Sequence, residues 1–115
     1  MERTRVYLYQ TTFNTSYTDK RDSIVLPTNV KKVVGICPNL TRGTGYISVV
    51  NEKTNDILVN QARVSDDNGH WNEKNIPVLN RPEANNLFYV FRMINGEKER
   101  KNDCVLKIYV TYLEE

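Results

Sequence analysis

Apolar and polar residues alternate in short stretches along the whole chain. Alternation with a period of two is typical of β-strands, and no stretch shows the i, i+3, i+4 spacing of an amphipathic helix. The alternation predicts about eight strands, at residues 3–13, 22–26, 30–37, 46–51, 56–61, 76–79, 87–94 and 105–113. Polar turns separate these strands, and Pro38 is expected to end the third, because proline lacks the N–H that a strand ladder needs.

Two pairs of neighbouring strands are expected to form hairpins. The strands at 46–51 and 56–61 flank the polar segment 52–55, which has the length and composition of a hairpin turn. The strands at 87–94 and 105–113 are the most apolar in the chain. Turn residues open and close the charged segment between them, so we expect a long antiparallel hairpin with a charged tip.

Short strands separated by polar turns predict an all-β fold, a two-sheet antiparallel sandwich. The chain of 115 residues accommodates one such domain, spanning 1–115. A jelly-roll-like sandwich fits better than an immunoglobulin-like one, which remains the alternative. An immunoglobulin domain has a core tryptophan and a tyrosine two residues before its second cysteine. Here Trp71 lies in a polar loop, and Asn102 stands two residues before Cys104.

The strands at 3–13, 87–94 and 105–113 carry large apolar residues on both faces. One face of each strand can fill the core of the sandwich, and the other must be covered by something else. The covering element is either the long segment 65–86 or a partner protein. If it is a partner, the candidate interface consists of Tyr7, Tyr9, Phe13, Phe88, Val90 and Tyr109.

Composition and charge narrow the classes of partner. The chain has 14 asparagines and only two alanines, as expected for strands joined by polar loops. Sixteen basic residues against fourteen acidic ones give a net charge of +2, a small excess for a protein that neutralises phosphates. No apolar run is long enough for a membrane span or a signal peptide. We therefore expect neither a specific nucleic acid nor a membrane as partner.

Residues that could carry chemistry are few. His70 is the only histidine, and no serine or cysteine is paired with it by spacing, so we expect no enzyme and no catalytic residues. Cys37 and Cys104 lack the spacing of a metal site, and we expect no metal and no cofactor. The two cysteines are expected to be buried thiols, with a single disulfide as the alternative. Trp71 is a candidate for stacking on a ligand, or else a plug over one end of the sandwich.

One stretch carries a family resemblance: Ile24-Val25-Leu26-Pro27-Thr28-Asn29-Val30-Lys31-Lys32-Val33-Val34-Gly35-Ile36. Together with the asparagine-rich loops and the expected terminal hairpin, it resembles small all-β accessory virion proteins of tailed bacteriophages. The resemblance implies a jelly-roll-like subunit without catalysis that assembles on a capsid, head fibre or tail. No functional residue is carried over from it.

The function expected from these observations is that of a structural assembly protein of the virion, such as a decoration, auxiliary capsid, head-fibre or connector subunit. Its partners would be copies of itself, a larger capsid or tail protein, or both, in a homo-oligomer or a hetero-complex. Its location would be the virion, with the cytoplasm as the alternative. The alternative function is a carbohydrate- or ligand-binding sandwich that uses Trp71 and the loops of 65–86.

Overall fold

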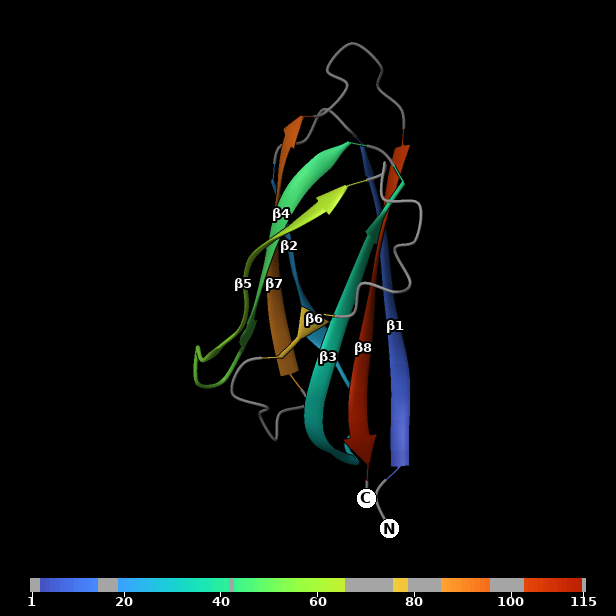
Figure 1. Cartoon of the computed structure of the whole chain (residues 1–115), viewed down its shortest axis with the longest axis vertical. Coiled ribbons are helices and arrows are strands. Elements are labelled where there is room, and N and C mark those ends of the chain that lie inside the picture. Colours follow the sequence, from blue (N-terminus) through green and yellow to red (C-terminus); the bar gives the residue numbers. More distant parts are fainter. Residues whose placement is uncertain are drawn as a thin grey trace.

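A computed structural model of the chain describes residues 3–14, 19–41, 43–65, 76–78, 86–95 and 103–114. Within these ranges the chain forms strands and turns, without a helix that could cross a membrane. The strands, shown in Figure 1, are β1 Arg3–Asn14, β2 Asp19–Val25, β3 Val30–Leu40, β4 Thr44–Asn51, β5 Ile57–Ser65, β6 Ile76–Pro77, β7 Asn86–Asn95 and β8 Asp103–Glu114.

The strands form two four-stranded sheets that face each other (Figure 1). Sheet A has the order β1-β8-β3-β6 and sheet B the order β2-β7-β4-β5, and every neighbouring pair is antiparallel. The chain crosses from one sheet to the other at every connection except β4–β5. This order is that of a jelly roll, in which eight strands form two interlocking Greek keys. The predicted all-β, jelly-roll-like sandwich is therefore confirmed.

One of the two predicted hairpins forms. Strands β4 and β5 pair directly, and the N–H of Asn51 donates to the carbonyl of Asp56 at 2.8 Å across the turn. The turn needs one residue in the left-handed region, and Asn55 occupies it with φ 62°. Asparagine tolerates this conformation better than other residues with a Cβ, because its side chain bonds locally to the backbone.

The second predicted hairpin, between β7 and β8, is wrong. Strand β7 pairs with β2 and β4 in sheet B, whereas β8 pairs with β1 and β3 in sheet A. Each of the two strands has one face of large apolar residues that is fully buried, with Tyr89 and Phe91 on β7 and Leu106 and Ile108 on β8. Because β7 and β8 lie in different sheets, these two faces pack against each other across the core. If the strands were neighbours in one sheet, both faces would point the same way, and a further element would have to cover them.

Strand β3 also continues past Pro38 to Leu40, contrary to the prediction that the proline ends it. Directly after the end of β3, the N–H of Thr41 donates to the carbonyl of Val105 in β8. N–H directions alternate along a strand, so the nitrogen of Pro38 points away from β8. The described pairing with β6 on that side stops at Ile36. Proline is thus at a position where the ladder needs no donor.

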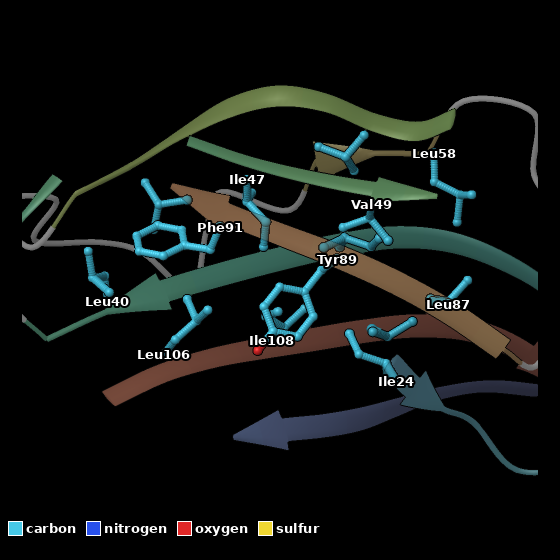
Figure 2. Packing of buried hydrophobic residues seen from close by; sticks show 14 of the residues in the cluster. Ile24, Leu40, Ile47, Val49, Leu58, Leu87, Tyr89, Phe91, Leu106 and Ile108 are labelled. Carbon is cyan, nitrogen blue, oxygen red and sulfur yellow. The ribbon is translucent and has the colours of Figure 1, made fainter. Parts of the chain in front are cut away.

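The core lies between the sheets and is filled from both (Figure 2). Leu106 and Ile108 of β8 face Phe91 and Tyr89 of β7, and all four are at most 1% exposed. Two edge-to-face aromatic pairs span the gap between sheets, which adds to the energy of burial alone. The ring centroids of Tyr9 and Tyr89 are 5.2 Å apart, and those of Phe13 and Phe91 are 6.0 Å apart.

Candidate interaction surfaces

The outer face of sheet B carries a row of apolar side chains that the core does not use. Register places Ile57 of β5 beside Val50 of β4, and Val50 beside Phe88 of β7. Val90 follows two residues along on the same face of β7. Ile57 is 44% exposed, and the other three are half-buried. We call these four residues the sheet B patch.

Polar and aromatic residues border the sheet B patch at one end. Tyr46 of β4 is 41% exposed and lies in register between Arg63 of β5 and Arg92 of β7. A shallow depression of about 270 Å³ opens beside it. Its lining residues are Tyr46, Ser48, Gln61, Val90 and Arg92.

A bulge in β5 shapes this depression. Strand β5 has one residue more than β4 between the pairs Ile47–Ala62 and Val49–Val59. Gln61 takes up the extra length with φ 48°, and its backbone N–H donates to Ser48 Oγ at 3.0 Å. A bulge turns side chains away from the regular pleat, so the sheet is locally hollowed here.

The outer face of sheet A carries apolar side chains of β1 and β8, with polar ones such as Gln10, Lys107 and Thr111 among them. Val6 and Leu8 of β1 are 60% and 44% exposed. Leu8 is in register with Tyr109 of β8, and Leu113 lies further along the same face. The placement of Tyr109 on an outer face agrees with its selection from the sequence, and its role in an interface stays a prediction. We call Val6, Leu8, Tyr109 and Leu113 the sheet A patch.

Strand β1 presents the opposite face to the one selected from the sequence. Tyr7, Tyr9 and Phe13 point inward, and Phe13 is only 7% exposed in the core, so its assignment to the interface is wrong. Tyr7 and Tyr9 are half-buried and pack against the core. The physical reason is size: the aromatic face spans the gap between the sheets and reaches Tyr89 and Phe91, which the shorter side chains of Val6 and Leu8 would not fill.

Other apolar residues on the outer faces were not among those selected from the sequence. They are Tyr46, Val50 and Ile57 on sheet B, and Val6 and Leu8 on sheet A. The signal for β4 was in the sequence, because Tyr46 and Val50 alternate with the buried Ile47 and Val49, which makes this strand apolar on both faces as well. Phe88 and Val90 do lie on an outer face, and their contact with a partner stays a prediction.

A hydrogen-bonded cluster of Tyr9, Tyr89 and Asp22 joins the two sheets at the β1–β2 side. The Tyr9 hydroxyl donates to Asp22 Oδ2 at 3.1 Å and lies 2.9 Å from the Tyr89 hydroxyl. With its own proton directed to Asp22, Tyr9 accepts the hydrogen bond from Tyr89. Burial raises the pKa of both tyrosines above their usual value, so both stay neutral across the physiological range.

An ion pair joins the start of β1 to the end of β8. Arg5 Nε lies 2.8 Å from Glu114 Oε1, and Asn29 Nδ2 donates to Glu114 Oε2 at 2.7 Å. The Glu114 side chain is only 12% exposed. The hydrogen bond from Arg5 lowers the pKa of the Glu114 carboxyl, which therefore stays ionised to a lower pH in the folded state than in the unfolded chain.

Replacing Glu114 with glutamine is expected to remove a pH-dependent part of the stability. Because the folded-state pKa is lowered, the stabilisation is present above the unfolded-state pKa and is lost as pH falls through the folded-state value. Urea unfolding of wild type and Glu114→Gln should differ most near neutral pH, and the difference should shrink on acidification. Glu52→Gln is the control, since Glu52 accepts its hydrogen bond from Ser23 Oγ and not from a guanidinium. A difference that stays constant with pH would contradict this account.

The remaining candidates from the sequence give no site in the part of the chain that is described. Trp71, His70 and most of the segment 65–86 lie outside the described residues. Cys37 and Cys104 are both buried thiols. They lie on opposite faces of sheet A, because Cys37 is in register with the outward Tyr109 whereas Cys104 points into the core. Within the described ranges, no three His, Cys, Asp or Glu side chains come together as a metal site would require.

Comparison with known proteins gives a likeness in structure only. No protein-family model matches the chain, and no curated protein does. A chain of the cyanophage Pam1 capsid asymmetric unit is 15% identical with a TM-score of 0.57, over 99% of this chain and 86% of that one.

Two further phage structures are looser matches. One is the acid-stable capsid of Helicobacter pylori bacteriophage KHP30, 16% identical with a TM-score of 0.44, over 98% of this chain and 93% of that one. The other is the major capsid protein P2 of bacteriophage PM2, 11% identical with a TM-score of 0.47, over 98% of this chain and 45% of that one. Neither is close enough to carry an argument.

The predicted resemblance to virion proteins is thus confirmed for the fold, although one of its supports, the hairpin of β7 and β8, does not form. In fold, this chain is a jelly roll similar to a chain of a bacteriophage capsid.

Proposed function

We propose that this protein is a non-enzymatic structural subunit of a bacteriophage virion. Its role is that of an accessory subunit, in a decoration, auxiliary capsid, head-fibre or connector position, that attaches through protein–protein contacts. The observation that carries the proposal is the sheet B patch, an apolar row across three strands on a face that the sandwich core does not need. The likeness in fold to a capsid chain supports it.

The sheet B patch has the composition of a protein interface. Phe88 and Val90 supply apolar area at its centre, whereas Tyr46, Arg63 and Arg92 border it. Interfaces are enriched in aromatic residues and arginine, with a polar rim around an apolar centre. Such a surface fits a larger capsid or tail protein that presents an apolar patch with carboxylates opposite Arg63 and Arg92. The alternative ligand-binding function depended on Trp71, which lies outside the described residues, so no observation favours it.

The test is co-sedimentation with phage particles assembled without this protein. Wild-type protein added to such particles should sediment with them. The double variant Phe88→Lys, Val90→Lys should lose most of this binding, because each lysine would bury an ammonium group without a partner in the complex. Circular dichroism should show that the variant keeps the wild-type fold, since both side chains point away from the core.

Val25→Lys is the matched control. Val25 is 62% exposed, lies at the end of β2 outside the sheet B patch, and receives one lysine of the kind that the double variant receives twice. It should sediment like wild type. Absence of wild-type protein from mature particles by mass spectrometry, together with failure to bind the particles, would refute a virion role. Equal loss of binding in Val25→Lys would refute the sheet B patch as the contact.

A further inference from the structure

The edge strands of the two sheets differ in how well they resist pairing with another chain. An edge strand presents unpaired N–H and C=O groups, and proteins protect such edges by shortness, bulges or charge. Strand β6 has two residues, β5 has its bulge at Gln61, and β2 begins with the four consecutive charged or ion-paired residues 19–22. Strand β1 has none of these protections along its centre.

Strand β1 is long and regular. It pairs with β8 over all twelve residues without a register shift, whereas the β3–β8, β4–β5 and β4–β7 pairs each contain at least one. Its only charged residues, Arg3 and Arg5, lie at one end, and Glu114 already neutralises Arg5. The central part of the edge is therefore uncharged.

The backbone groups that face the open side of β1 can be identified from β8. The N–H of Thr41, the residue after β3, donates to the carbonyl of Val105, so the odd-numbered residues of β8 direct their backbone groups toward β3. The even-numbered residues of β8 then face β1, where they are in register with the odd-numbered residues of β1. The residues of β1 whose N–H and C=O point to the open side are Thr4, Val6, Leu8, Gln10 and Thr12.

We propose that β1 pairs with β1 of a second copy of this chain, antiparallel and about a two-fold axis at Tyr7. Charge selects the antiparallel direction, because a parallel copy would place Arg3 beside its own counterpart, whereas the antiparallel copy places it beside the uncharged end of the strand. The two A sheets then join into one continuous sheet.

The apolar side chains select the register. With the axis at Tyr7, Val6 of each copy lies opposite Leu8 of the other, and both residues have their backbone groups on the open side. The four side chains form one apolar cluster on the outer face of sheet A, next to Tyr109, which is in register with Leu8. Pairing would cover Val6 and Leu8, which at 60% and 44% are the most exposed apolar residues among the described side chains of sheet A. This contact goes beyond the proposed function, which uses sheet B.

Hydrogen exchange resolved by residue tests the pairing directly. In a concentrated sample, the amides of Val6 and Leu8 should exchange at least about tenfold more slowly than in a dilute one, because only the dimer bonds them. The amides of Tyr7 and Tyr9, which bond to β8, should be protected at both concentrations. Sedimentation equilibrium on the same samples measures the dimer.

Variants separate this contact from a general loss of fold. Val6→Lys with Leu8→Lys should raise the dissociation constant of the dimer at least about tenfold and abolish the concentration-dependent protection. Val25→Lys should leave both unchanged. A monomer at all concentrations, or a dimer in which the amides of Val6 and Leu8 exchange freely, would overturn the proposal. Neither result would bear on the virion role, which the co-sedimentation experiment tests independently.

Discussion

Replacing Gly45 with alanine is expected to lower the free energy of unfolding by about 3 kcal/mol. Gly45 is buried in β4, and a Cβ there would lie 2.5 Å from the carbonyl oxygen of Arg92 and 2.6 Å from Cζ of Phe91. The first obstacle is backbone of the paired strand β7, which cannot move aside like the end of a flexible side chain. Relief would require β4 and β7 to separate, at the cost of ladder bonds.

Urea unfolding followed by circular dichroism measures this loss. Tyr46→Ala is the control at the next residue, and it should cost less than about 1 kcal/mol because Tyr46 points outward and is 41% exposed. A Gly45→Ala protein as stable as wild type would show that β4 and β7 do not approach as closely as described.

Truncating Phe91 to alanine is expected to cost about 4 kcal/mol, because the ring is 1% exposed and its removal leaves a cavity between the sheets. The loss includes the edge-to-face contact with Phe13. The same truncation at Phe88, three residues earlier on the opposite face of β7, should cost about 1 kcal/mol and act mainly on partner binding. Thermal unfolding of both variants gives the comparison. Equal losses would mean that the two faces of β7 are not divided between core and surface.

Strand positions and residue faces could be predicted from the sequence, because alternation with a period of two groups side chains by face whatever the tertiary structure. The choice of the inward face could not be predicted where both faces are apolar. On β7 the selection of Phe88 and Val90 for an outer face agrees with the structure, which buries Tyr89 and Phe91 on the other face. On β1 the tyrosine face was placed outside, because its inward position depends on Tyr89 and Asp22, which come from other strands.

Strand partners were harder to predict than strands. Neighbours in sequence are the cheapest to pair, since a short connection loses little entropy on closure, and this favoured a hairpin of β7 and β8. The structure pairs β8 with β1 and β3 instead, over nearly its whole length. Burying the apolar faces of β7 and β8 against each other stabilises the fold by more than the entropy lost in pairing strands that are distant in sequence. The pattern of residues within a single strand does not show which of these two contributions is larger.

The central place of β8 in sheet A has a consequence for the order of folding. Strand β8 follows all other described strands in the chain, yet it is the one that both β1 and β3 need (Figure 1). During synthesis, β1 therefore stays unpaired until β8 has been made, after all the other described strands. Contacts so distant in sequence slow folding, and an unpaired β1 with its apolar residues would be open to the wrong neighbours throughout that time. We therefore expect a good yield of native protein only if β8 pairs quickly with β1 and β3.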